Sequence, residues 1–281
     1  MLGNRLGRLS LPPFLPKIRE DTRGHRDRMI IIRSLAFQLA FYAVFIVLMI
    51  IGLPTMLISR GAVIFVVRCW VNSSLWLLAT ICGAKVEFRG LENVPRGACI
   101  IAPKHQSFLE TLALIAVIPE FTYILKKELI SIPGFGRWLK ASGQIVLDRA
   151  KRGNALAVMQ RAVMEKLAQG RKVIIFPEGT RKPIGAPPAY KIGVAILCEA
   201  CKVPCVPVAL NAGLFWPRHS LLRPPGTIVI EFFPPLTCQD SKRSLLEALE
   251  AVIEPASNAL VAEALAENPG ILAFQKTAAK A

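Results

Sequence analysis

The 281-residue sequence predicts an α/β fold, a mostly parallel sheet covered by helices, preceded by a pair of apolar membrane helices. From residue 85 onward, short β-type runs alternate with helix-type runs, as in parallel sheets whose strands are joined by helices. Before residue 85, two long runs carry almost no charge. We therefore expect a basic N-terminal arm at 1–33, a membrane-embedded helical hairpin or in-plane helix pair at 34–84, and one α/β domain at 85–281.

The composition indicates contact with lipid and with anions. The chain is 53% hydrophobic and only 19% charged, which is more apolar than an ordinary soluble domain. Its formal net charge is +16, and its pI is near 10.0. Such a balance favours partners such as phospholipid headgroups, phosphorylated substrates or nucleic acid. Nucleic acid is disfavoured because the basic residues adjoin apolar segments and lack interleaved aromatic residues.

The arm and the first apolar run differ sharply in charge. Residues 1–33 hold eight Lys or Arg and three acidic residues, and Pro12, Pro13 and Pro16 are expected to break any long helix there. This arm should lie against anionic lipid. Residues 34–59 carry no charge and are long enough, at about 1.5 Å per residue, to cross a bilayer core of roughly 30 Å. A membrane helix is predicted for this run.

The second apolar run, 61–84, contains Arg68. An Arg near the middle of a spanning helix costs about 2.5–3.5 kcal/mol, so this run is expected to lie in the interface with Arg68 reaching the headgroups. A single crossing would also separate the basic arm from the basic domain. A hairpin or in-plane pair keeps both on the cytoplasmic face. Two roles stay open for it, attachment alone or attachment combined with admission of a lipid chain to the site.

The α/β domain is predicted from runs of β-branched and aromatic residues that alternate with helix-like runs. The expected strands are residues 86–89, 98–102, 122–125, 144–147, 172–176, 203–210 and 227–233. The expected helices are residues 108–118, 154–168, 191–200 and 244–263.

His105 and Glu110 follow the second predicted strand, at the kind of position where open α/β sheets bind ligands. On one continuous helix they would lie about 140° apart, so His105 must precede the helix if the two are to meet. Ser107 and Glu110 form a capping-box pattern, which places the helix start at Ser107. A carboxylate there can fix the imidazole tautomer and stabilise its protonated form. Glu110 acting only as a cap, with His105 a plain loop residue, is the equal alternative on this segment alone.

Cations follow three other predicted strands. Phe176 to Arg181 reads Phe-Pro-Glu-Gly-Thr-Arg, in which Gly179 permits close backbone approach, Thr180 offers a hydroxyl and Arg181 can bind phosphate in bidentate fashion. Arg149 ends another strand, and Lys126 a further one. A plain turn with a surface cation is the alternative for each of these segments.

Together, and in this order, these segments resemble the glycerolipid acyltransferase family over roughly residues 85–235. The family carries His-x4-acid, matched by His105 and Glu110, and Phe-Pro-Glu-Gly-Thr-Arg, matched letter for letter. It also has a strand ending in Arg, matched by Arg149, and a Val-Pro-Val block, matched by residues 206–208. The acid is more often Asp in the family, and Glu110 adds one methylene.

The resemblance implies that an acyl group passes from acyl-CoA or acyl-ACP directly to the sn-2 hydroxyl of 1-acylglycerol-3-phosphate, giving phosphatidate. His105 would be the general base and Glu110 its support, with no metal and no cofactor besides the acyl donor. It also implies an acceptor phosphate site, formed by Arg149, Glu178, Gly179, Thr180 and Arg181, with Lys126 as a weaker contact. The expected place is the cytoplasmic face of a membrane, a bacterial inner membrane above all.

Two other functions stay open from the sequence. One is acyl transfer to another lysolipid, such as lyso-ornithine lipid. The other is a non-catalytic protein that binds membrane lipid. The phosphate-binding cations favour a phosphorylated acceptor, and the intact set of His105, Glu110 and Arg181 argues against loss of catalysis.

Overall fold

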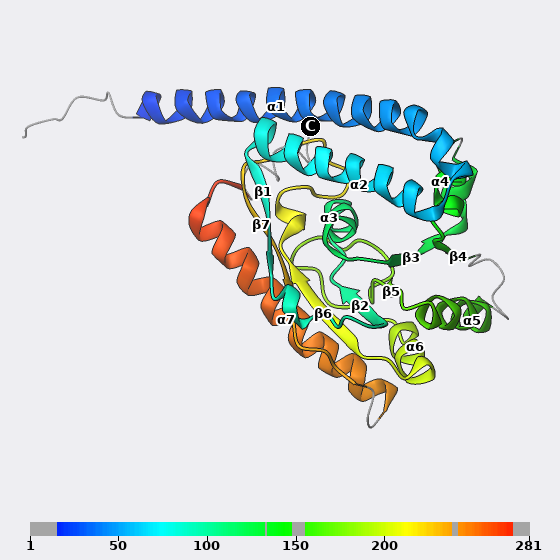
Figure 1. Cartoon of the computed structure of the whole chain (residues 1–281). Coiled ribbons are helices and arrows are strands. Elements are labelled where there is room, and N and C mark those ends of the chain that lie inside the picture. The colour runs from blue at the N-terminus through cyan, green and yellow to red at the C-terminus, as the bar shows by residue number, and fades with distance from the viewer. Residues whose placement is uncertain (1–15, 133, 148–154, 238–240, 272–281) are drawn as a thin grey trace, which may run out of the picture.

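The computed structural model describes residues 16–132, 134–147, 155–237 and 241–271. Its centre is a seven-stranded sheet of order β1-β7-β6-β2-β5-β3-β4 (Figure 1). The strands are β1 (Ala84–Arg89), β2 (Cys99–Pro103), β3 (Phe121–Lys126), β4 (Ile145–Leu147), β5 (Lys172–Ile174), β6 (Cys205–Leu210) and β7 (Gly226–Phe232). The α-helices are α1 (Pro16–Ile51), α2 (Arg60–Leu77), α3 (Leu109–Val117), α4 (Phe135–Ala141), α5 (Ala155–Ala168), α6 (Gly193–Cys201) and α7 (Lys242–Glu267).

The sheet is mostly parallel, as predicted. β6, β2, β5, β3 and β4 are parallel neighbours, whereas β7 pairs antiparallel with β6 and parallel with β1. All seven expected strands are present, with boundaries shifted by at most two residues. β2 and its neighbours therefore deliver their carboxyl ends to one edge, where the predicted site residues follow.

Alternation along the buried strands builds two separate cores. Cys99 and Ile101 of β2 pack with residues of α1, α2 and α3 on one face of the sheet. Ile100 and Ala102 pack with residues of α5, α6 and α7 on the other face. Successive side chains of a strand point to opposite faces, so a strand covered on both sides is apolar throughout.

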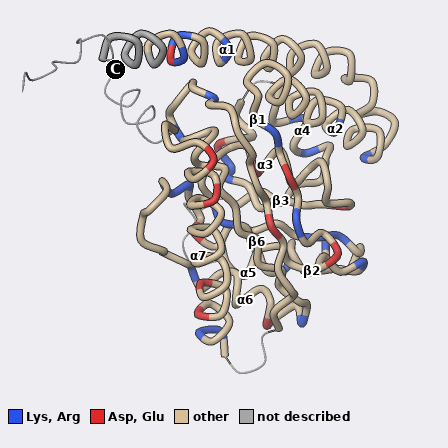
Figure 2. The backbone as a smooth tube through the Cα atoms, turned by 90° about the vertical axis from the view of Figure 1, so that its left-hand side faces the viewer, with Lys and Arg blue, Asp and Glu red and all other residues tan. Residues whose placement is uncertain are grey.

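The N-terminal helix is longer than predicted. α1 begins at Pro16 and continues to Ile51, so the expected boundary at residue 33 falls inside a helix. Pro16 does not break α1 because the first helical residue has no need of an N–H donor. Pro12 and Pro13 lie outside the described residues. Figure 2 shows Lys, Arg, Asp and Glu only toward the N-terminal end of α1, with the rest of the helix free of them.

Arg68 of α2 does not reach outward toward headgroups, which corrects the expectation. Its Nε and Nη2 donate hydrogen bonds to the carbonyl oxygens of Ile115 and Ile118, at 3.4 and 3.0 Å. These carbonyls lie at the C-terminal end of α3, where backbone oxygens lack helical partners and a cation is favoured. The charge in the apolar run thus fastens α2 to the α/β domain.

α4 was not predicted. It is seven residues long and lies between the segment around residue 133 and the turn at Gly143. Gly136 lies so close to the carbonyl of Ile130 that any side chain would collide with it. Trp138 and Leu139 of α4 are buried, so tertiary packing stabilises a helix too short to form by propensity alone.

Candidate active site

The loop between β2 and α3 brings His105 and Glu110 together. Nδ1 of His105 lies 2.9 Å from Oε1 of Glu110. The helix α3 begins at Leu109, one residue after the start of the expected range 108–118, and the Ser107 hydroxyl accepts from the Leu109 N–H at 3.0 Å. His105 thus precedes the helix and Glu110 lies in its first turn, as the spacing required. The bond to a carboxylate assigns the proton to Nδ1 and leaves Nε2 as the free acceptor.

Glu110 is fully buried, and its Oε1 is a convergence point. Besides the imidazole, it accepts hydrogen bonds from the backbone N–H groups of Gln106 at 2.9 Å and Ser107 at 2.7 Å. Its Oε2 has no partner among the described residues. These charge-assisted bonds hold the loop and the carboxylate in one arrangement. Glu110 therefore both caps α3 and contacts His105, so the two interpretations of this residue are compatible.

Two aromatic rings fix the plane of the imidazole. The His105 ring stacks on Phe176 with centroids 3.8 Å apart and an interplanar angle of 17°. Tyr123 lies nearly parallel to the Phe176 ring, with the two ring centroids 6.2 Å apart. Burial and, to a smaller extent, the charge of Glu110 raise the pKa of Tyr123, so its hydroxyl stays neutral and donates to the Thr111 carbonyl at 2.9 Å.

Glu178 bonds to the loop that carries His105. Its Oε2 accepts from the His105 N–H at 2.9 Å, and its Oε1 lies 3.1 Å from Nζ of Lys104. Lys104 also bonds Oε1 of Glu254 on α7 at 2.6 Å, and the Tyr190 hydroxyl donates to the same oxygen at 2.9 Å. Lys104 and Glu178 are almost completely buried. A buried pair with good geometry and further hydrogen bonds resists rearrangement, because breaking it strands a charge in a dry interior.

A cavity of about 630 Å³ opens beside His105. Its wall near the imidazole includes Gly179 and Thr180, and cations lie around it: Lys126, Arg181, Lys191 and Arg218. Much of the remaining wall is apolar and comes in part from the helix pair, through Phe45, Met49, Val67 and Trp70. The cavity is thus lined by both basic and apolar side chains, and His105 is part of its wall.

Comparison with known proteins identifies the kind of chemistry that this arrangement performs. A family model described as Acyltransferase matches residues 85–211. A 1-acyl-sn-glycerol-3-phosphate acyltransferase from Pseudomonas aeruginosa is 35% identical over 204 residues, which are 72% of this chain and 77% of that protein. The chain belongs to this acyltransferase family.

Further relatives agree with this membership. The chloroplastic 1-acyl-sn-glycerol-3-phosphate acyltransferase LPAT1 of Arabidopsis thaliana is 31% identical over 62% of this chain, and the match spans about half, 49%, of that protein. The crystal structure of the 1-acyl-sn-glycerophosphate acyltransferase PlsC from Thermotoga maritima superposes with a TM-score of 0.69 at 25% identity, covering 82% of this chain and 97% of that one. The structural similarity therefore covers most of the chain and is not limited to the sheet.

Most of the predicted site residues of this acyltransferase meet at the cavity. His105, Gly179, Thr180, Arg181 and Lys126 line it. Glu110 and Glu178 lie behind it and bond to the loop that carries His105. Arg149 lies outside the described residues.

Two cations of the acyltransferase cavity were not predicted. Lys191 begins the segment leading to α6, and its side chain lies 3.3 Å from the place a Cβ on Gly179 would occupy. Gly179 has φ +65°, so a side chain there would be strained as well as crowded. Arg218 follows Trp216 in the loop before β7. Neither cation follows a predicted strand, so the pattern that found Arg181 could not find them.

Proposed function

We propose that this acyltransferase moves an acyl group from an acyl thioester to the sn-2 hydroxyl of 1-acylglycerol-3-phosphate and forms phosphatidate, with His105 as general base. The observation that carries the proposal is the 2.9 Å contact between Nδ1 of His105 and buried Glu110. With the ring proton on Nδ1, Nε2 is the nitrogen that can act as a base, and His105 lines a cavity that also holds basic and apolar side chains.

The reaction needs one proton to move twice. Nε2 of His105 takes the proton of the acceptor hydroxyl while its oxygen attacks the thioester carbonyl carbon. The resulting imidazolium is stabilised by Glu110. When the tetrahedral intermediate collapses, the carbon–sulfur bond breaks and the departing thiolate receives the proton from His105. No bond forms between the acyl group and the protein, and the base is regenerated.

The acceptor phosphate is proposed to bind among the cations around the cavity. Arg181 follows the Gly179 turn in the sequence, the Lys191 side chain lies against that turn, and Lys126 and Arg218 line the same cavity. Arg149 belongs to the same proposal through the family motif. Fixing the phosphate sets the sn-2 hydroxyl against Nε2, which lowers the entropy cost of the reaction. Both carboxylate oxygens of Glu178 bond to the protein, so we assign it the positioning of this loop.

The helix pair is proposed to keep the enzyme at a membrane and to shelter the acyl chain. The segments Gly24–Ile51 and Arg60–Cys82 are long and apolar enough to cross a bilayer. α2, however, packs on α3 and bonds to it through Arg68, whereas Leu39 and Ile50 of α1 are 75% and 63% exposed. We therefore place the pair in the plane of one leaflet, on the cytoplasmic face, with the exposed side of α1 among the lipid chains.

Acceptor choice tests this function. Purified enzyme in detergent micelles receives labelled acyl-CoA or acyl-ACP together with equal amounts of lysophosphatidate and lyso-ornithine lipid. Labelled phosphatidate as the main product, with the label at sn-2, is the expected result. Acylation of the phosphate-free acceptor instead would overturn the assignment of the acceptor, and comparison of the two donors identifies the thioester used.

A further inference from the structure

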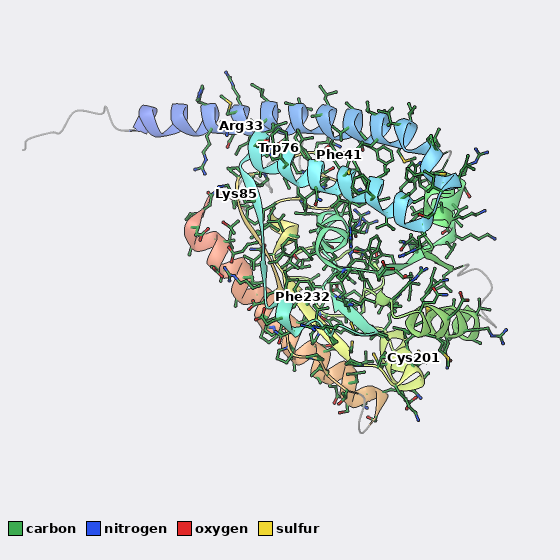
Figure 3. All side chains as sticks on the ribbon, viewed as in Figure 1. Arg33, Phe41, Trp76, Lys85, Cys201 and Phe232 are labelled. Carbon is green, nitrogen blue, oxygen red and sulfur yellow. The ribbon has the colours of Figure 1, made fainter. Side chains whose placement is uncertain are left out.

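A second cavity, of about 600 Å³, lies between the N-terminal half of α1 and the loop before β7, away from the active site. Its basic wall is formed by His25, Arg26 and Arg33 of α1 and by Arg223 of the loop, and the rest of the wall is uncharged. Figure 3 labels Arg33 on α1 and Lys85 on β1, near the end of the sheet where this cavity lies. In the described part of the chain, no Asp or Glu lines it.

Arg223 is the unusual residue of this cavity. Only 3% of its surface is exposed, and its Nη1 donates to the carbonyls of Ser220 and Leu222 at 2.8 and 2.7 Å. Its guanidinium carbon lies 4.1 Å from the centre of the Trp216 ring, in a cation–π contact. Its Nε has no partner among the described residues. The cation is thus built into the protein with a donor left over and with no carboxylate to neutralise it.

A buried cation without a counter-ion is unfavourable unless an anion binds it. Burial lowers the pKa of Arg223 to about 9, which expresses the same cost. The backbone N–H of Arg223 donates to the Ser34 hydroxyl of α1 at 2.9 Å. Together with the two Nη1 bonds, this bond holds Arg223 against α1, in the cavity that the exposed cations Arg26 and Arg33 also line.

From this we infer that the cavity between α1 and Arg223 is a binding site for the phosphodiester headgroup of an anionic glycerophospholipid. A guanidinium presents several N–H donors to phosphate oxygens, and three Arg with a His supply the charge. Its neighbours on α1 suit a lipid, because Ile32 on the same helix is 61% exposed and can contact acyl chains. The site is separate from the acceptor site and does not depend on the proposed reaction.

The test measures binding of dihexanoyl phosphatidylglycerol to the full chain in uncharged detergent, by isothermal titration calorimetry. The variant Arg26→Gln/Arg33→Gln removes two exposed cations of the site. Its matched control, Arg28→Gln/Arg243→Gln, removes two exposed cations that do not line it. At about 1 kcal/mol per cation, the site variant should bind about thirtyfold more weakly than wild type, and the control should bind within about threefold.

Two further measurements sharpen the result. Arg223→Gln should lose binding at least as strongly, and the surface double variant still decides the question if Arg223→Gln does not fold. In parallel, binding of 3′,5′-ADP is measured with the same variants, because this nucleotide represents the phosphates of coenzyme A. Equal lipid binding by the site variant and its control would overturn the proposal. So would loss of 3′,5′-ADP binding rather than lipid binding, since that result would assign the cavity to the acyl donor.

Discussion

Around the loop that follows β2, charged side chains are buried and bonded to the protein, whereas along α1 large apolar side chains are exposed. Lys104, Glu110 and Glu178 are at most 5% exposed and share bonds that fix the backbone around His105. Leu39 of α1 is 75% exposed although it is apolar. The charged side chains of the first region bond to other parts of the protein, whereas the apolar side chains of α1 are exposed and are proposed to contact lipid. We therefore expect mutations to separate the chemistry from the proposed membrane contact.

The largest effect is expected on kcat, from a change at His105. His105→Ala removes the base and should lower kcat by about 10²- to 10⁴-fold, because general-base catalysis contributes that much. The fold should persist, since His105 is only partly buried and its ring makes one hydrogen bond in the described chain. The matched control is His219→Ala, an exposed loop histidine that does not line the cavity. A kcat within about threefold of wild type for His105→Ala would remove the proposed role.

The next effect is on stability. Glu178→Gln breaks the pair with Lys104 and should lower the free energy of unfolding by about 3 kcal/mol, because a buried cation then loses one partner. Urea titration in detergent, followed by circular dichroism, measures this change. Glu165→Gln, at an exposed pair on α5, should change it by less than about 0.5 kcal/mol. If Glu178→Gln is as stable as wild type but has a much higher acceptor KM, the residue binds substrate instead.

A third change acts on acceptor binding alone. Arg181→Ala should raise the KM for lysophosphatidate by about ten- to a hundredfold, since hydrogen bonds to charged groups contribute about 1.5–3 kcal/mol. Initial rates at varied acceptor concentration measure it. The neighbouring Lys182→Ala is the control, because the Lys182 side chain does not line the cavity. An unchanged acceptor KM in Arg181→Ala would exclude this residue from the phosphate site.

The smallest effect is expected on vesicle binding, from a change on the exposed side of α1. Leu39→Gln should weaken binding to vesicles by about tenfold, because burying one large apolar side chain contributes roughly 1.5 kcal/mol or more. Its kcat on a micellar substrate should stay unchanged. Sedimentation with phospholipid vesicles measures the binding, and Val158→Gln on α5, also exposed, is the control. Equal vesicle binding by both variants would place the lipid contact elsewhere.

The same contrast explains what the sequence could predict. Strands and most helices follow from local periodicity. Helix geometry allowed the His105–Glu110 contact but left Glu110 as a plain helix cap equally open, and the structure shows both. Arg68 was misplaced because its partners, the carbonyls ending α3, lie 47 and 50 residues away. The pairing of Lys104 with Glu178 and Glu254 spans 74 and 150 residues and leaves no local pattern. Contacts of this kind depend on the tertiary fold.

His105 and Glu110 are proposed to act as one catalytic unit, and a double-mutant cycle tests whether they do. Single-turnover rates of acyl transfer to lysophosphatidate are measured for wild type, His105→Ala, Glu110→Gln and the double variant. Glu110→Gln keeps an oxygen for the backbone N–H groups of the loop while removing the charge. If Glu110 acts through His105, the double variant should be about as slow as His105→Ala alone. Losses that multiply would show that the two residues act independently and would contradict the account.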